Sequence, residues 1–275
     1  NKNSKYIYLV KKILIIGKRG FIGNNLSIYL KKFNKVSHKS FKDFYKKKLK
    51  INNFDFVINT SINKNYIKKK YNSKFDNDLK ISNLLINDKT TYIFLSSRKV
   101  YKSGINIKEN GKLLPKSNYA KNKLITEQKL IEKLNKNLII LRISNIIGVK
   151  DKVKKIHNTF IDVFFYNIKK GFVLNNQKNF KDFISIDKFC EIVNNIIKRN
   201  LRGIYNVSIG RKIYLNDLIS WLNKFNKKVY KSSNKKFKDD SFKLKKRKLM
   251  TKIKIKNSIQ ELKKYCLKIS KKRFS

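Results

Sequence analysis

The sequence is poor in cysteine, histidine and long apolar runs, and each shortage excludes a class of protein. Two isolated cysteines, Cys190 and Cys266, and two histidines, His38 and His157, can build neither a disulfide framework nor a Cys/His metal cluster. We therefore expect two free thiols and no metal site. No stretch approaches the roughly 18 consecutive apolar residues of a membrane span, and residues 6–10 are too short and too lysine-flanked for a signal-peptide core. A soluble cytoplasmic protein is predicted.

Acidic residues are also scarce, at 17 against 69 basic ones, which gives 275 residues a net charge of +52. Such an excess ordinarily indicates a nucleic-acid partner. Here lysine outnumbers arginine by 61 to 8, and the lysines are spread over the whole sequence rather than gathered in one arm or stripe. Lysine and the other abundant residues share A/T-rich codons, so mutational drift accounts for the charge. We predict no specific nucleic-acid partner. The positive electrostatic field of the chain is compatible with an anionic small ligand.

Glycine is rare, yet three of the nine glycines fall at intervals of three in one stretch. Residues 13–16 form an unbroken aliphatic run, typical of a parallel strand buried on both faces, and residues 22–33 show the apolar spacing of an amphipathic helix. Gly17, Gly20 and Gly23 lie at the join. Such a turn lets backbone N–H groups approach a pyrophosphate at the helix N-terminus. The alternative is a glycine turn that only packs tightly.

Further strands alternate with helices along the chain. Strands are predicted at residues 35–38, 54–61, 92–97 and 138–145, with a helical stretch at 62–90 and a helix from Ser117 between them. The alternation predicts an α/β fold with a doubly wound parallel (Rossmann) sheet. Beyond residue 148 the pattern is less regular, with helices at 160–168, 187–198, 215–225 and 259–269 and strands at 180–186 and 203–208. We expect a dinucleotide-binding domain over residues 1–147, completed by parts of 181–209, and a substrate-binding lobe over 148–275.

Two strand ends carry polar residues where a cofactor would lie. In NAD-binding folds an acidic residue after the second strand binds the adenosine ribose. His38, Lys39 and Ser40 occupy this place. A basic replacement favours a 2′-phosphate, so we predict NAD(P), with NADP slightly preferred. The strand at 54–61 ends in the small residues Thr60 and Ser61, against which a ligand can lie.

Tyr119 and Lys123 are candidates for proton transfer because they lie four residues apart on one face of a helix. An ammonium group beside a phenol stabilises its anion and makes it a usable acid or base. Ser97, at a strand end, is placed to hydrogen-bond the substrate oxygen. Together these groups suit hydride transfer between a nicotinamide and a carbon that bears oxygen.

The Tyr/Lys spacing alone has no weight in so lysine-rich a chain. It occurs four times, at Tyr8, Tyr66, Tyr119 and Tyr166. Only the third follows a strand that ends in Ser-Ser and stands just after Pro115, the single proline. Taken singly, Ser97 is also explained as a strand-end cap and Lys123 as a solvated helix lysine.

Six segments, in order along residues 13 to about 215, resemble the motifs of one enzyme family. Residues 17–23 match G-x-x-G-F-I-G, residues 96–102 resemble S-S-x-x-V-Y-G with Lys102 for the glycine, and residues 115–127 resemble P-x-x-x-Y-x-x-S-K-x-x-x-E with Asn122 for the serine. Residues 141–148 resemble L-R-x-x-N-V-Y-G, residues 181–187 R-D-F-V-H-V-D, and residues 203–207 G-x-Y-N-V. The chain is therefore similar to the NAD-dependent epimerase/dehydratase family of extended short-chain dehydrogenases/reductases, which act on nucleotide sugars.

The resemblance implies a role for each matching residue. Ser97, Tyr119 and Lys123 would be catalytic, with Tyr119 transferring the proton and Lys123 also holding the nicotinamide ribose. The cofactor would be bound by Gly17, Gly20, Phe21, Ile22, Gly23, Thr60 and Ser61, with His38 and Lys39 near its adenosine ribose. Ser97, Asn145 and Lys181 would bind the substrate, the last two at its phosphates. Lysine at 181, where the family usually has arginine, keeps the charge but loses the bidentate fork. The family often pairs through the helix that bears the tyrosine and lysine, which implies a possible homodimer.

One departure from the family pattern bears on the reaction. The 4,6-dehydratases carry an Asp-Glu pair directly after the catalytic hydroxyl residue, whereas this chain has Arg98 and Lys99 there. The resemblance then leaves an epimerase with retained NAD or a 4-keto-sugar reductase that consumes NAD(P)H, and the short chain and missing ribose acid favour the reductase. The other hypotheses are a catalytically silent dinucleotide-binding protein and a nucleic-acid binder.

Overall fold

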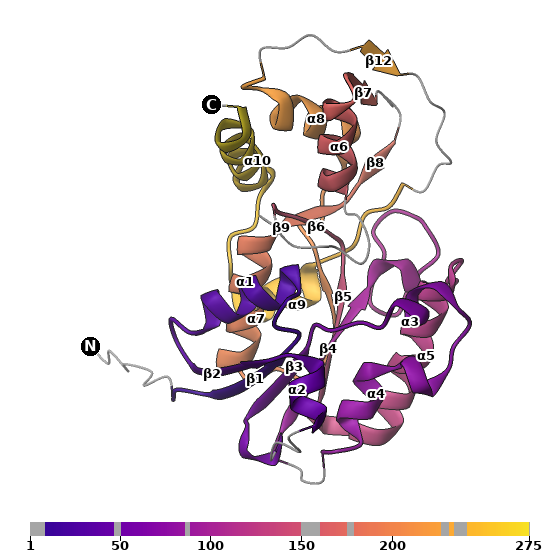
Figure 1. The fold of residues 1–275 in the computed structure, drawn as a ribbon, viewed down its shortest axis with the longest axis vertical. Helices are drawn as coiled ribbons and strands as arrows, with labels where there is room; N and C mark the ends of the chain where they lie inside the picture. The colour runs from indigo at the N-terminus through magenta and orange to yellow at the C-terminus, as the bar shows by residue number, and fades with distance from the viewer. Residues whose placement is uncertain are drawn as a thin grey trace.

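A parallel six-stranded sheet forms the centre of the computed structural model, which describes residues 9–46, 51–85, 89–149, 160–174, 179–226, 231–233 and 241–274. The strand order is β10-β5-β4-β3-β1-β2, and every neighbouring pair is parallel (Figure 1). The strands are β1 (Lys12–Ile16), β2 (Lys35–Lys39), β3 (Phe56–Asn59), β4 (Thr91–Ser97), β5 (Leu138–Ile143) and β10 (Gly203–Val207). The predicted α/β doubly wound sheet is thus confirmed.

Helices cover both faces of this sheet. Figure 1 shows α1 (Phe21–Leu30), α7 (Ile186–Lys198) and α9 (Arg247–Ile253) on one side, and α3 (Lys64–Lys68), α4 (Asn77–Ser82) and α5 (Asn118–Leu134) on the other. The side chains of β1 alternate between the two layers: Ile13 and Ile15 pack with the first set, and Leu14 and Ile16 with the second. All four are fully buried, which explains the unbroken aliphatic run.

The strand order reverses at β1, which lies between β2 and β3. At such a switch point the connections leave in opposite directions, and ligands of doubly wound sheets bind there, outside the carboxyl ends of the strands. The glycine turn follows β1 and residues 60–61 follow β3. The fold therefore places both predicted cofactor segments at the switch point.

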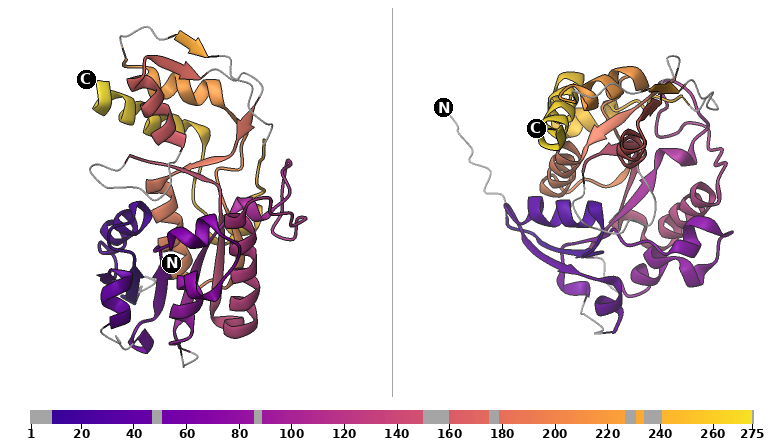
Figure 2. Two further views of the ribbon diagram at one scale, coloured as in Figure 1. Left: turned by 45° about the vertical axis from the view of Figure 1, so that its right-hand side comes forward. Right: turned by 45° about the horizontal axis from the view of Figure 1, so that its top comes forward.

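The remaining elements form a second layered body above the carboxyl edge of the sheet (Figures 1 and 2). Its helices are α6 (Phe160–Lys169), α8 (Leu215–Asn223) and α10 (Ile259–Phe274), and its strand pairs are β6 (Asn145–Ile147) with β9 (Phe183–Ser185), β8 (Phe180–Lys181) with β11 (Ile213–Tyr214), and β7 (Phe172–Leu174) with β12 (Lys231–Ser233). Three elements that follow residue 147 in the chain, β10, α7 and α9, pack with the large sheet. The domain boundary after residue 147 stays a prediction. Within the described ranges, no helix combines the length and apolarity needed to cross a membrane.

Some predicted elements are divided in the structure. Residues 62–90 contain α3, the 3-10 turn η2 (Ser73–Phe75) and α4 rather than continuous helix. The strand expected at 180–186 is interrupted at Asp182, whose buried carboxylate accepts hydrogen bonds from the N–H groups of Gly210 and Leu244, both at 3.1 Å. The carboxylate thereby ties three distant segments together, and burial raises its pKa to about 7. The remaining short elements of the sheet body are α2 (Phe41–Lys46), η1 (Ile51–Asn53), η3 (Arg98–Val100) and η4 (Asn135–Asn137).

A buried ion pair fixes α5 against the sheet. Arg142 of β5 donates to both carboxylate oxygens of Glu127 on α5, with Nε–oxygen distances of 3.1 Å. Glu127 also accepts the hydroxyl of Ser96 on β4. Since α5 carries Tyr119 and Lys123, this pair sets their position relative to the strand ends.

Removing the Glu127 carboxylate leaves the Arg142 guanidinium buried without its charge partner. We expect Glu127→Ala to lower the free energy of unfolding by about 3–5 kcal/mol, measured by urea denaturation. Glu132→Ala, an exposed position on the same helix, is the matched control and should change it by less than about 0.5 kcal/mol. Equal effects of the two substitutions would contradict this account of α5.

Candidate active site

The glycine turn packs directly on the end of β3. Gly17 has a φ of +122°, and a Cβ there would lie 2.3 Å from Thr60 Oγ1. A Cβ on Gly23 would lie 2.4 Å from the same oxygen. The Thr60 hydroxyl donates to the carbonyl of Ile16 at 2.9 Å, which fixes it between the two strands. Glycine is therefore required at 17 and 23 by packing, whether or not a ligand binds.

The start of α1 offers backbone groups rather than side chains. Its N-cap is Gly20, which has no side chain to accept the first N–H groups of the helix. Phe21 and Ile22 pack partly buried against the core, and a Cβ on Gly148 would lie 2.4 Å from Cζ of Phe21. The main chain of these residues, rather than their side chains, is therefore available to a ligand. An anion with several oxygens, such as a pyrophosphate, fits this arrangement.

The end of β2 closes the turn from the other side. The N–H groups of Gly17 and Lys18 donate to the carbonyl of Lys39 at 2.8 and 3.2 Å. His38 Nε2 is buried and has no hydrogen-bond partner within the described part of the chain. Burial lowers the pKa of His38, and the charges of Lys18 and Lys31 act in the same direction. This corner is positive and holds an unsatisfied ring nitrogen beside the place predicted for the adenosine ribose.

Ser97 and Tyr119 come from elements that lie side by side. Ser97 ends β4, and its hydroxyl accepts the N–H of Lys99 at 3.3 Å, so the predicted capping role is real. Tyr119 lies in the first turn of α5, whose N-cap Ser117 accepts the N–H of Ala120. The Lys99 ammonium lies 5.9 Å from the centroid of the Tyr119 ring. Both hydroxyl-bearing residues are half-buried.

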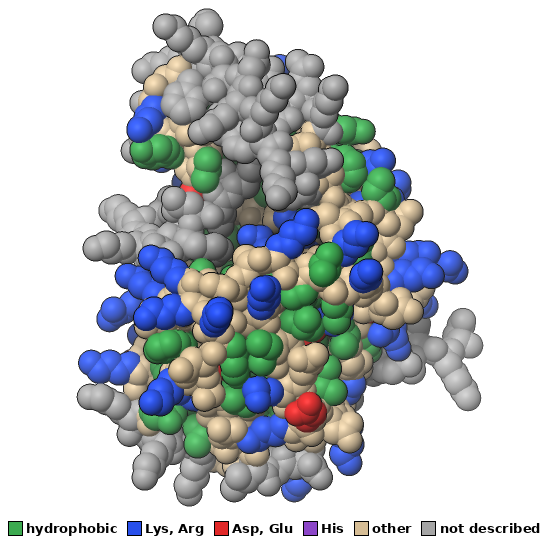
Figure 3. Space-filling model, turned by 90° about the vertical axis from the view of Figure 1, so that its right-hand side faces the viewer, with side chains coloured by type: hydrophobic (Ala, Val, Ile, Leu, Met, Phe, Trp, Pro, Cys, Tyr) green, Lys and Arg blue, Asp and Glu red, His purple; other side chains and the backbone are tan. Residues whose placement is uncertain are grey.

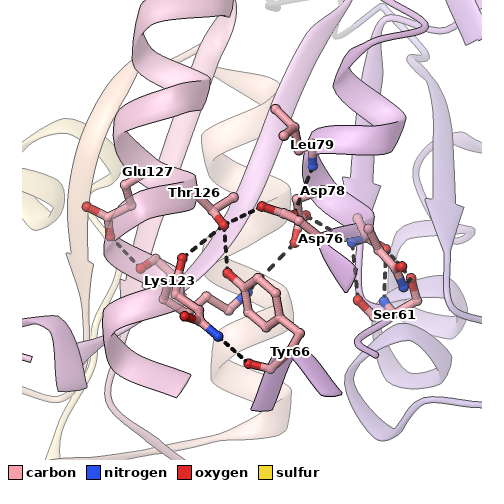
Figure 4. A network of polar contacts seen from close by, with 12 residues as sticks. Ser61, Tyr66, Asp76, Asp78, Leu79, Lys123, Thr126 and Glu127 are labelled. Atoms are coloured by element: carbon pink, nitrogen blue, oxygen red, sulfur yellow. Dashed lines mark hydrogen bonds and ion pairs between the residues drawn. The ribbon is translucent and has the colours of Figure 1, made fainter. Parts of the chain in front are cut away.

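Lys123 is not a solvated helix lysine, because only 6% of it is exposed. Its Nζ lies 3.8 Å from Oδ2 of Asp78 (Figure 4). It also lies 4.4 Å from the centroid of the Phe94 ring and 5.7 Å from that of Tyr66. The alternative interpretation of this lysine is therefore wrong. Its contact with a nicotinamide ribose stays a prediction.

Asp78 lies beside Lys123 and is not among the residues predicted from the sequence. Its Oδ1 accepts hydrogen bonds from Asn59 Nδ2 at 2.9 Å and from the Tyr92 hydroxyl at 2.8 Å. Burial raises its pKa to about 6, with Lys123 acting in the opposite direction. The available signal was the scarcity of acidic residues: two of 17 fall at 76 and 78 in a lysine-laced stretch.

Asn122 has a structural task where the family motif has serine. Its amide donates to the carbonyls of Tyr66 and Lys69 at 2.7 and 2.9 Å. These bonds satisfy the end of the short helix α3 and hold it against α5. The departure from the motif therefore fits the neighbouring backbone of this chain.

The predicted substrate residues Asn145 and Lys181 lie at the junction of the two bodies. Asn145 begins β6, and its N–H approaches the carbonyl of Asp182 at 3.4 Å. Lys181 is the residue before Asp182, so the structure brings the two predicted residues into one region. Both are half-buried. Their contact with a substrate phosphate stays a prediction.

Comparison with known proteins gives one family and many similar folds. The profile of the NAD dependent epimerase/dehydratase family matches residues 13–208. No curated protein matches significantly. Among solved structures, a UDP-N-acetylglucosamine 4-epimerase from Methanobrevibacter ruminantium, in complex with UDP-N-acetylmuramic acid, has a TM-score of 0.78 at 19% identity, covering 95% of this chain and 97% of that one.

Two further structures represent other reactions on the same fold. The dTDP-glucose 4,6-dehydratase from Bacillus anthracis in complex with NAD has a TM-score of 0.76 at 14% identity, with 96% and 97% coverage. A dTDP-4-dehydrorhamnose reductase from Clostridium acetobutylicum has a TM-score of 0.70 at 18% identity, with 92% and 98% coverage. At such identities the likeness shows the fold alone.

The geometry of the turn predicts a sharp response to one methyl group. Gly17→Ala forces a side chain into positive φ and against Thr60, so the free energy of unfolding should fall by at least about 1–3 kcal/mol. NADPH binding, followed by its fluorescence, should weaken in parallel. Gly104→Ala, where no atom lies within 4 Å of the added carbon, is the control and should leave both unchanged. Wild-type stability and binding in Gly17→Ala would show that this geometry is wrong.

Proposed function

Since the chain belongs to the NAD-dependent epimerase/dehydratase family, we propose that it is an NAD(P)H-dependent reductase of a 4-keto-sugar nucleotide. The pair of cations directly after Ser97 argues against a dehydratase, and the absence of a ribose-binding acid at His38 and Lys39 favours a reductase over an epimerase. Lys99 approaches the ring of Tyr119, and the Arg98 guanidinium stacks 3.7 Å from the centroid of the Phe242 ring. Eliminating water from a sugar needs an acid and a base at this place, and neither side chain is a carboxylate.

The proposed site uses the residues that the fold gathers at the carboxyl edge. Gly17, Gly20 and Gly23, with the main chain of Phe21 and Ile22, hold the pyrophosphate, and Thr60 and Ser61 border the cofactor. Lys123 holds the nicotinamide ribose. Asn145 and Lys181 bind the phosphates of the substrate. The approach of Lys99 to Tyr119 supports this grouping, because it joins the end of β4 to the start of α5.

In the proposed reaction a keto group becomes a hydroxyl group. When bound, the reduced nicotinamide supplies the hydride that adds to the carbonyl carbon. Tyr119 donates its hydroxyl proton to the carbonyl oxygen, and Ser97 donates a hydrogen bond to that oxygen as charge develops on it. The Lys123 ammonium stabilises the phenolate that Tyr119 leaves, and solvent returns the proton to complete the cycle.

The preference for NADP is supported by the charge at the end of β2. His38 and Lys39 replace the acidic residue of NAD-binding folds, and the charges of Lys18 and Lys31 reach His38. These positive charges attract an added phosphate on the adenosine ribose. A dissociable NADPH suits a reductase, which must exchange its cofactor in every cycle.

Replacing the proton donor should separate binding from chemistry. We expect Tyr119→Phe to keep NADPH affinity but to lower turnover of the active keto-sugar nucleotide by roughly 10²–10⁴-fold. Tyr166→Phe is the matched control, because Tyr166 belongs to an equal Tyr/Lys spacing on α6 and is exposed. NADPH oxidation against a panel of UDP- and dTDP-linked 4-keto sugars is the measurement. Full activity in Tyr119→Phe would end the proposal.

The state of the purified protein should distinguish a reductase from an epimerase. An epimerase oxidises and re-reduces its sugar on one retained cofactor, so it carries NAD⁺ through purification. We expect native mass spectrometry to find no retained NAD⁺ and stoichiometric binding of added NADPH. Bound NAD⁺ together with interconversion of UDP-hexose epimers would identify an epimerase instead. NADPH binding without turnover on either panel would identify a silent binding protein.

A further inference from the structure

Among the residues that the structure describes, the amine of Lys123 has one ion-pair partner, the carboxylate of Asp78. The rings of Phe94 and Tyr66 border this amine. Oδ2 of Asp78 lies 3.8 Å from it (Figure 4). Both charged side chains are less than a tenth exposed. Rings attract a cation but do not fix its direction, and the lysine stem is flexible. The carboxylate is the group that sets where the ammonium points.

Asp78 is itself held firmly in this orientation. Asn59 of β3 and the Tyr92 hydroxyl of β4 both donate to Oδ1, which leaves Oδ2 toward Lys123. Asp78 lies in the first turn of α4, whose N-cap Asp76 accepts the N–H of Leu79 at 3.0 Å. Two strands and one helix thus fix the carboxylate before it meets the amine of α5.

The function proposed above assigns no role to Asp78, and stability alone does not explain it. A buried ion pair contributes little net stability compared with apolar groups of the same shape. This one has a single contact at 3.8 Å, beyond hydrogen-bond distance. The pair is poorly optimised for stability, yet its carboxylate faces an amine with a proposed role in the reaction. This indicates that the carboxylate positions the amine.

We propose that Asp78 is a positioning residue whose carboxylate orients the Lys123 ammonium for the cofactor ribose and for the phenolate of Tyr119. This inference rests on the proposed role of Lys123. The carboxylate itself touches neither substrate nor cofactor, and it acts only through the amine. It follows that the pair is functional only while Asp78 is ionised.

The ionisation of Asp78 depends on groups from every element around it. These are Lys123 from α5, Asp76 from the start of α4, Tyr92 from β4, the amide of Asn59 from β3 and the hydroxyl of Tyr66 from α3. Burial is the largest influence and raises the pKa to about 6; Asp76 also raises it, whereas Lys123 and the two hydrogen bonds lower it. The carboxylate is therefore charged above pH 6. As the pH falls through 6 it becomes neutral and no longer attracts the Lys123 ammonium.

Asp78→Asn tests this dependence, because the carboxamide resembles a permanently protonated carboxyl group. The quantity to measure is the ratio of the NADPH dissociation constants of Asp78→Asn and wild type between pH 5 and 8.5. We expect the variant to bind roughly three- to thirtyfold more weakly above pH 7 and the ratio to approach one near pH 5. Taking a ratio cancels the titration of NADPH itself. A ratio that does not change with pH would reduce Asp78 to a structural residue and overturn the proposal.

Two further variants show whether the effect passes through the amine. In a Lys123→Met background, Asp78→Asn should cause no additional loss of NADPH affinity, whereas an additive loss contradicts the proposal. Asp76→Asn is the matched control, since it removes a buried carboxylate two residues away that does not contact Lys123. It should keep the pH dependence, shifted slightly downward because a charge that raises the pKa of Asp78 is gone.

A spectroscopic measurement separates this inference from the proposed function. A buried lysine ammonium that is shielded from water gives a ¹H–¹⁵N signal, which Lys123→Met assigns by its loss. We expect Asp78→Asn to shift or broaden that signal, even if no substrate is turned over. An unchanged signal overturns the proposal, while a changed signal without NADPH binding overturns only the proposed function. Should Asp78→Asn fail to fold, Lys123→Met must raise the pKa of Asp78, read from its ¹³C carboxyl titration; an unchanged value overturns the proposal.

Discussion

The fixed position of α5 against β4 and β5 is the constraint on which the candidate site depends. Glu127 bonds Ser96, the residue before Ser97, and it also pairs with Arg142. Glu127 lies one helical turn beyond Lys123 and two beyond Tyr119. One buried carboxylate therefore sets the register between the end of β4 and the helix face that carries the phenol and the amine. Any chemistry shared by these groups requires that register to hold.

The sequence was sufficient for the sheet and for the elements that end at the site, because their signals are local. A strand buried on both faces needs a continuous apolar run, and residues 13–16 show one. The division of residues 62–90 could not be predicted, since short helices such as α3 are fixed by distant partners, here the amide of Asn122. The same holds for the break at Asp182, which depends on N–H groups 28 and 62 residues away.

The composition of this chain changes which residues carry information. Basic side chains are scattered over the face shown in Figure 3, with few acidic ones among them. A lysine at any one position is therefore weak evidence for a functional role. Among the residues that the structure describes, four acids are buried, and all have specific partners: Asp76, Asp78, Glu127 and Asp182. Burying a carboxylate is costly unless partners compensate it. In a lysine-biased sequence, acids inside predicted helices or beside predicted strands are therefore the better guide to a site.

The two explanations of the glycine turn are compatible, and the helix caps distinguish what each explains. Packing against Thr60 accounts for glycine at 17 and 23, and a Cβ on Gly20 would make a tight contact of 3.2 Å with the carbonyl oxygen of Gly17. The N-cap side chains of α3, α4, α5 and α7 each accept an N–H, whereas the N-caps of α1, α8 and α9 accept none. Of these three uncapped helices, α1 is the one whose N-cap, Gly20, has no side chain at all. Leaving the first N–H groups of α1 to an outside acceptor is what a pyrophosphate site requires.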